Sequence, residues 1–175
     1  MAVKQLNDKF AIITDVVFFW SKVHEPAPKY NPDDGREYSV NCFIDADTVK
    51  QLKKMKINKN FNEVDEDKYP EHEGLYVLKL TQNELKRDGS PLPKPVVIDR
   101  FKSPIEDNIG NGSTGQVKIY MQEGIGASKG KLNVKLSAMM VENLIPYEGG
   151  NSAADGFDTE DAPAGVADDD DDIPF

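Results

Sequence analysis

The chain has few of the residues that build disulfides, metal centres and membrane spans. Its 175 residues include one cysteine, Cys42, so no disulfide can form within the chain, and two histidines, His24 and His72. That set offers no zinc site at a recognised spacing. The longest apolar run, 16–20, is far too short to cross a bilayer, and the N-terminus lacks the apolar segment of a signal peptide. We therefore expect a cytoplasmic protein that does not bind a membrane.

The sequence also lacks a recognisable catalytic constellation. The glycine spacing of segment 124–131 (GIGASKGK) is wrong for a phosphate loop, and Leu132 stands where that motif needs Ser or Thr. A nuclease-type metal could be held near His72 by the acidic residues Asp65, Glu66, Asp67 and Glu71. Solvated charge explains them better, because a lysine lies among them and their spacing shows no repeated geometry. We predict a protein that is not an enzyme, with no cofactor and no metal.

The net charge of −10 is unevenly distributed along the chain. Of the 31 acidic residues, nine lie in 151–175, which has no Lys or Arg, and 22 remain against the 21 basic residues of the rest. The body is therefore nearly neutral, and a basic stripe on one face is possible.

The strongest single signal is the C-terminal stretch 168–175. Five consecutive aspartates cannot pack into a core, and Ile-Pro-Phe follows them. A disordered solubility tail needs no terminal aromatic, whereas a recognition peptide uses one to fill a pocket. We expect these residues to bind a partner: Asp168, Asp169, Asp170, Asp171, Asp172, Ile173, Pro174 and Phe175.

Most of the body has the composition and alternation of β-strands. FAIITDVVFFW at 10–20 predicts a long strand, apolar on both faces and bent near Thr14 and Asp15. Further strands are predicted at 36–45, 75–82, 96–100, 116–122 and 131–141. Their alternation predicts an inward set: Tyr38, Val40, Cys42, Ile44, Tyr76, Leu78, Leu80, Val117, Ile119, Met121, Leu132, Val134, Leu136, Ala138 and Met140.

One helix and several loops separate these strands. Asp47 or Thr48 is placed to cap a helix that runs to about residue 57. The prolines of 21–35 predict a long loop there, and 60–74 reads as a polar, acidic loop. The fold class we predict is mainly β: a five-stranded Greek-key OB-fold barrel with one helix over residues 1–148, and a flexible acidic tail over 149–175.

The outward sets of several strands share lysines and aromatic residues. Such a surface suits single-stranded nucleic acid, because lysines neutralise phosphates and exposed rings stack on unpaired bases. Lysines on exposed strand faces are also common in soluble β proteins. The candidate contacts are Trp20, Lys22, Arg36, Phe43, Lys79, Arg100, Phe101, Lys102, Lys118, Tyr120, Lys131 and Lys135.

Two resemblances favour that function. The end of the chain, DDDIPF at 170–175, resembles the tip of bacterial single-stranded DNA-binding proteins. In that family the tip docks onto replication and repair proteins and competes with DNA for the groove. Segment 95–141, with VVID, GNGS, VKIY, GAS and KLNVKL, resembles the single-stranded DNA-binding proteins of short-tailed phages. Those proteins have an OB-fold core and an acidic tail ending in an aromatic.

The resemblances imply a protein that binds and protects single-stranded DNA during replication, recombination and repair. They imply that its tail recruits a polymerase, a helicase-primase or host tail-binding proteins, in the host cytoplasm if a phage encodes the chain. A homodimer is possible. The alternative is an interaction protein whose acidic end mimics nucleic acid and blocks a basic partner.

Overall fold

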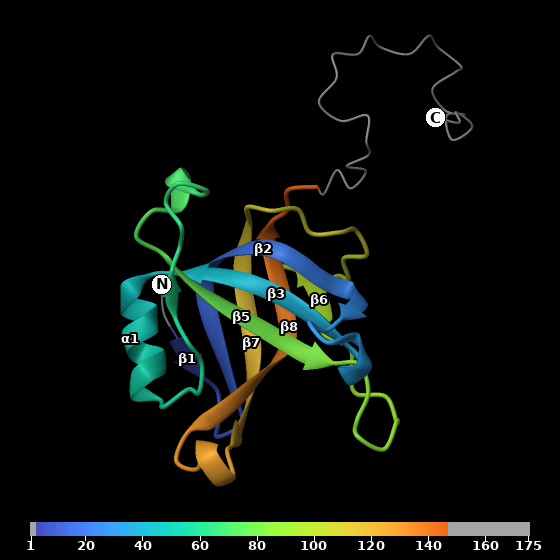
Figure 1. Cartoon of the computed structure of the whole chain (residues 1–175). Coiled ribbons are helices and arrows are strands. Elements are labelled where there is room, and N and C mark those ends of the chain that lie inside the picture. Colours follow the sequence, from blue (N-terminus) through green and yellow to red (C-terminus); the bar gives the residue numbers. More distant parts are fainter. Residues whose placement is uncertain (1–2, 147–175) are drawn as a thin grey trace, which may run out of the picture.

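The computed structural model describes residues 3–146 (Figure 1). The predicted tail and the boundary at 148 lie outside the described residues, so both stay predictions. The strands are β1 (Val3–Gln5), β2 (Phe10–Pro28), β3 (Arg36–Ile44), β4 (Asn62–Glu63), β5 (Tyr76–Asn83), β6 (Val96–Asp99), β7 (Ser113–Glu123) and β8 (Leu132–Asn143). The helix α1 spans Ala46–Lys54, and short 3-10 turns occupy Pro32–Asp34, Pro70–His72 and Gly126–Ser128.

The strands form one curled sheet in the order β4-β5-β3-β2-β7-β8-β6, with β1 added to β2. Neighbouring strands in the sheet run antiparallel, except β6 and β8, which run parallel. The sheet curls so that β5 contacts β8, and a bridge between Ile57 and Leu132 ties the segment after α1 to β8. In Figure 1, β2, β3 and β5 cross in front of β7 and β8. The predicted fold class, mainly β with one helix, is confirmed, and β1, β4 and β6 are short additions to the five long strands.

The barrel interior is built from the predicted alternation. Tyr38, Val40, Cys42 and Ile44 of β3 are buried, as are the inward residues of β7. They pack with Leu78 and Leu80 of β5, while Tyr76 and Leu132 are only partly buried at the edge of this cluster. Removing these apolar surfaces from water is the main stabilising contribution to such a fold.

The inward set of β8 differs from the prediction in its second half. Val134 and Leu136 are buried, but so are Met139 and Val141, whereas Ala138 is only partly buried. The pairing with β7 explains this, because Ile119 lies opposite Leu136 and Lys118 opposite Ala138. The extra residue, Ser137, forms a bulge that reverses which side chains face inward.

Strand β2 is longer than predicted. It continues through 21–28, where a loop was expected, and this part pairs with β3 through Lys22 and Ala27. Its pairing with β7 ends at Phe18, so the later part is free along one side and can hold Pro26 and Pro28 there. The predicted bend is present: Asp15 has a φ of 55°, at a register shift between Ile13 and Val16.

Helix α1 begins two or three residues earlier than predicted. Asp45, rather than Asp47 or Thr48, is its N-cap, and its side chain accepts a hydrogen bond from the Thr48 backbone N–H at 2.8 Å. Thr48 is instead buried, and Val49 and Leu52 reach the core. Nowhere in residues 3–146 is there a helix that is long and apolar enough to cross a membrane.

Candidate nucleic-acid interface

The outer face of β2, β3 and β5 carries cross-strand rows of side chains. Paired residues of neighbouring strands point to the same side of a sheet. The registers therefore place four rows on this face: Val17–Phe43–Val77, Phe19–Asn41–Lys79, Lys22–Ser39–Thr81 and Ala27–Glu37–Asn83. We call this face the platform. It changes along the strands from apolar to polar.

An aromatic cluster covers the apolar end of the platform. The rings of Phe19 and Phe43 stack at 4.3 Å, and Tyr69 packs edge-on against both at 5.0 and 5.2 Å. His72 adds two further edge contacts. The segment between β4 and β5 thus folds over these rings and leaves Phe43 only 2% exposed.

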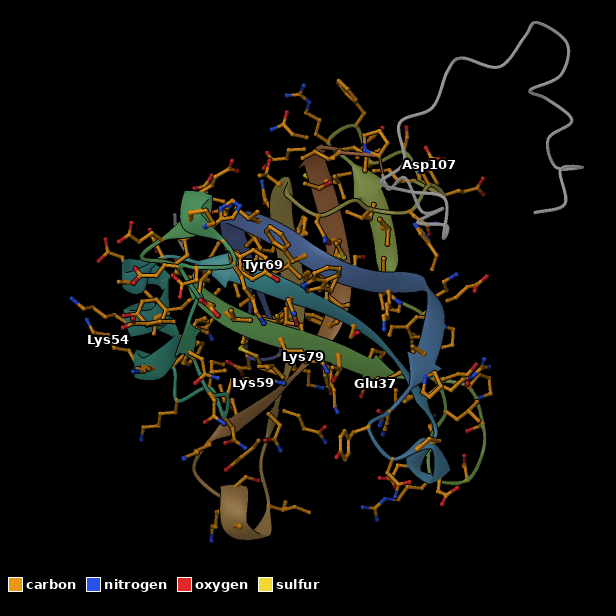
Figure 2. All side chains as sticks on the ribbon, turned by 45° about the horizontal axis from the view of Figure 1, so that its top comes forward. Glu37, Lys54, Lys59, Tyr69, Lys79 and Asp107 are labelled. Atoms are coloured by element: carbon orange, nitrogen blue, oxygen red, sulfur yellow. The ribbon has the colours of Figure 1, made fainter. Side chains whose placement is uncertain are left out.

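Phe43 was predicted to stack on bases, and its burial contradicts that role. The alternation of β3 places Phe43 on the outer face, as predicted, but the segment between β4 and β5 covers its ring and buries it. Tyr69, on that loop, is half-buried and lies where Phe43 was expected to be accessible (Figure 2). Phe43 instead supports Tyr69 from below.

Trp20 is the exposed aromatic beside this cluster. Its side chain is 54% exposed, and its indole N–H donates a 3.0 Å hydrogen bond to the Tyr69 hydroxyl. Its backbone has a φ of 52°, at an irregularity in the pairing of β2 and β3, and its N–H donates to Asn111 Oδ1 at 2.8 Å. The bulge turns the indole out of the core, and the two hydrogen bonds hold it in place.

The polar part of the platform presents lysines beside neutral hydrogen-bonding groups and one carboxylate, that of Glu37. Lys79 is exposed, and its Nζ lies 3.8 Å from Glu37 Oε2. Lys22 is exposed in the next row, with Ser39 and Thr81 beside it. This combination can neutralise phosphates and accept varied base edges, which is what sequence-tolerant binding of a single strand requires.

Lys59 extends this positive surface towards β8. Figure 2 places Lys59 close to Lys79. Partial burial of Lys59 lowers its pKa, and the positive charges of Lys135 and Lys79 lower it further, against a smaller opposing effect of Glu37. A bound phosphate would relieve this repulsion, because it supplies the missing opposite charge.

Lys118 and Tyr120 lie on a different part of the barrel surface. Both belong to the outer face of β7, which β2 separates from β3 and β8 separates from β5. Lys118 Nζ lies 4.6 Å from the centroid of the Phe10 ring, and Tyr120 contacts the same ring at 5.4 Å. Lys135 of β8 pairs with Tyr120 of β7, so it lies between the two surfaces, while Lys131 directly precedes β8. The predicted residues therefore do not form one groove.

Arg36 is placed at the end of β3, where an ion pair occupies its guanidinium. Its Nε and Nη2 donate to the two carboxylate oxygens of Glu84 at 2.9 and 2.6 Å. This bidentate contact raises the pKa of Arg36 and offsets its charge. We assign Arg36 to the joining of β3 and β5 rather than to phosphate binding.

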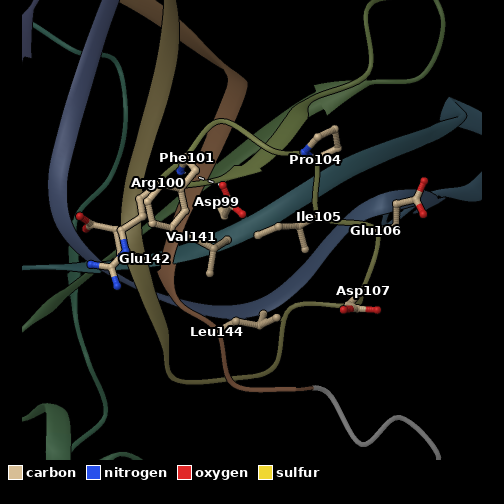
Figure 3. Close-up of a pocket in the computed structure, with 10 residues that line it drawn as sticks. All are labelled: Asp99, Arg100, Phe101, Pro104, Ile105, Glu106, Asp107, Val141, Glu142 and Leu144. Atoms are coloured by element: carbon tan, nitrogen blue, oxygen red, sulfur yellow. Dashed lines mark hydrogen bonds between the residues drawn. The ribbon is translucent and has the colours of Figure 1, made fainter.

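The triplet of Arg100, Phe101 and Lys102 follows β6, at the far end of the sheet order. The guanidinium of Arg100 lies 5.9 Å from the centroid of Phe101, which is 79% exposed. A hollow of about 490 Å³ beside them is lined by four carboxylates: Asp99, Glu106, Asp107 and Glu142 (Figure 3). That acidic lining disfavours a phosphate backbone.

Sequence reasoning missed three residues of this interface: Asn41 on the platform, Tyr69 on the loop that covers it, and Lys59 beside it. Neither Asn41 nor Lys59 was among the candidate contacts, and Tyr69 lay in the segment 60–74 that was expected to be a polar, acidic loop. The useful signal for Tyr69 was an aromatic residue next to a proline inside an otherwise acidic loop. Within residues 3–146, no cluster of His, Cys, Asp and Glu side chains could hold a metal ion.

The similarity of this chain to known proteins lies in its three-dimensional structure. No protein-family model and no curated protein sequence matches it. A single-stranded DNA-binding protein of bacteriophage Enc34, solved in complex with single-stranded DNA, aligns with a TM-score of 0.53 and 14% identity over 83% of this chain and 96% of that one.

A second phage structure is equally similar. Gp2.5, a single-stranded DNA-binding protein encoded by bacteriophage T7, gives a TM-score of 0.55 and 14% identity over 91% of this chain and 100% of its own. Because both alignments cover most of each chain, the shared feature is the whole barrel. The chain therefore has the OB-fold of the single-stranded DNA-binding proteins of bacteriophages.

Proposed function

We propose that this protein binds single-stranded DNA on the platform, without catalysis. The observation that carries the proposal is the pairing of an exposed Trp20, hydrogen-bonded to Tyr69, with the row Phe19–Asn41–Lys79 beside it. Stacking on exposed rings contributes about 1–3 kcal/mol per base and does not depend on base identity. The same fold in proteins that bind single-stranded DNA supports this assignment.

The aromatic rings and the lysines on and beside the platform contact different parts of the DNA strand. Trp20 and Tyr69 offer ring surfaces to bases, while Lys22, Lys79 and Lys59 approach phosphates. Each phosphate neutralised releases counterions, so affinity should fall with salt at a slope of about 0.7 per contact on a single strand.

Intrinsic fluorescence tests this function directly, because Trp20 is the only tryptophan in the chain. Titration with an oligothymidylate should quench its emission, with an affinity that falls as salt rises. A duplex of the same length is the control, since its bases are already stacked and should quench little. An emission that does not change with oligothymidylate, together with unchanged anisotropy of a labelled oligonucleotide, would contradict the proposal.

The acidic end extends the proposal to replication, recombination and repair. Residues 168–172 carry five carboxylates, and Ile-Pro-Phe follows. We propose that this stretch competes with DNA for the lysines of the platform and, once DNA displaces it, recruits partner proteins. The 25 residues of 151–175 would span about 28 Å as a flexible coil, enough to reach across a small domain.

A further inference from the structure

A second positive surface lies at the end of α1, outside the platform. A hollow of about 330 Å³ is lined by five lysines, Lys53, Lys56, Lys59, Lys129 and Lys131, together with Ile57, Phe61 and Gly130. No acidic side chain lines it. Five ammonium groups around one hollow repel each other, so a polyanion is the ligand that this arrangement favours.

The walls of this hollow are held together by backbone hydrogen bonds. The Leu132 N–H donates to the Lys56 carbonyl at 2.8 Å, and the Asn58 N–H donates to the Leu132 carbonyl at 2.7 Å. The Asn58 side chain also donates to Asn133 Oδ1 at 2.8 Å. These bonds join the backbone of the segment after α1 to the start of β8, so the two walls that carry the lysines are held together.

Lys59 connects the hollow to the platform. It lines the hollow, and it is close enough to Lys79 and Lys135 for their charges to act on it. Lys131 and Lys135 are four residues apart along the start of β8, which corresponds to about 13 Å of extended chain. Positive charge therefore continues from the platform past Lys59 into the hollow.

We propose that the hollow is a second phosphate-binding subsite, which a DNA strand enters after it has crossed the platform. The proposal rests on the proposed function and adds a path that the bound strand follows beyond the platform. The hollow offers charge with little exposed ring surface, because Phe61 is partly buried against the core. It should therefore hold the sugar–phosphate backbone without reading bases, and only strands long enough to reach it gain from it.

The test compares two oligonucleotide lengths on the full chain. The variant Lys53→Gln/Lys129→Gln removes one lysine from each wall of the hollow. The matched control, Lys50→Gln/Lys54→Gln, removes the same charge from exposed positions of α1 that do not line the hollow. Labelled oligothymidylates of about 5 and about 15 nucleotides bracket the usual site size of an OB-fold. Trp20 emission reports occupancy of the platform in both cases.

The hollow variant should bind the longer strand about tenfold more weakly at low salt, with a salt slope reduced by about 0.7 per lost contact. Its affinity for the shorter strand and both affinities of the control should stay within about twofold of wild type. Unchanged binding of both lengths would overturn the subsite, while quenching of Trp20 would still support the platform. An equal loss for both lengths would also overturn it, because the hollow would then act independently of strand length.

Discussion

At the scale of single residues, burial separates side chains that a strand pattern treats alike. Trp20 and Phe43 are both aromatic residues near the outer face, yet one is 54% and the other 2% exposed. Alternation gives the face on which a residue lies, but it contains no information about a loop that folds back over that face. The role of Tyr69 could not be predicted for the same reason, since it depends on the path of the segment 64–75.

Lys59 should make the affinity for single-stranded DNA depend on pH. Its pKa is lowered in the free protein, and a nearby phosphate should raise it. DNA binding then takes up a proton, so affinity should fall as pH rises through the lowered pKa of Lys59, which lies below the range of ordinary lysines. Anisotropy titrations across this pH range should show the fall. In Lys59→Arg, which stays charged, the affinity should be flat; an identical fall in both proteins would exclude Lys59.

Cys42 should be inert in the folded protein. Its side chain is fully buried in the barrel, and this burial raises the pKa of its thiol well above the ordinary range. Because the thiolate is the reactive form, a thiol reagent should react only after unfolding. Reaction with an aromatic disulfide reagent should be slow in buffer and complete within the mixing time in denaturant. Rapid reaction of the native protein would mean that β3 opens readily.

At the scale of elements, the strands could be predicted wherever one residue in two is apolar, and the errors lie at the bulge of β8 and in the proline-containing extension of β2. The residues of β3, β5 and β7 follow the predicted inward pattern. In β8 the bulge at Ser137 reverses it, and nothing in KLNVKLSAMMV marks that position. The extension of β2 was missed because prolines usually end a strand, whereas here they lie on its free side.

Gly115 allows β7 and β8 to approach closely next to a register shift. A Cβ at this position would run into the carbonyl oxygen of Met140 on β8. Gly115→Ala should therefore lower the free energy of unfolding by about 1–3 kcal/mol, as overpacking usually does. Chemical denaturation measures this. Gln116→Ala, at a partly exposed neighbouring position, is the control and should change stability by less than about 0.5 kcal/mol. Equal stability of the two variants would show that the strands can separate there without cost.

At the scale of the whole molecule, charge is divided between the body and the acidic end. Residues 151–175 hold nine acidic and no basic residues, while the rest is nearly balanced. This division could be predicted from the sequence, as could the fold class. The location of the proposed interface could not, because both β5 and β7 carry outward lysines, and only the strand order shows that these lie on different parts of the surface.

Deleting 168–175 should tighten binding of single-stranded DNA at low salt. The deletion removes five aspartates and a terminal Phe that, on our proposal, occupy the same lysines as DNA. This increase in affinity should disappear at high salt, where screening weakens the contacts of the lysines with DNA and with the acidic residues alike. Anisotropy titrations at two salt concentrations measure it. The same deletion should abolish capture of replication proteins; unchanged affinity would remove the competition with DNA.

The most direct test of the platform is a comparison of two matched double variants. Trp20→Ala/Lys79→Ala removes one ring and one lysine from the platform, and Tyr120→Ala/Lys118→Ala removes the same pair of chemistries from the outer face of β7. Circular dichroism and thermal unfolding should show that both variants are folded. Anisotropy titration with oligothymidylate should give at least about tenfold weaker binding for the first, since each stacked base contributes about 1–3 kcal/mol, and a change within about twofold for the second. The reverse order of affinities would place the strand on β7 and contradict the account.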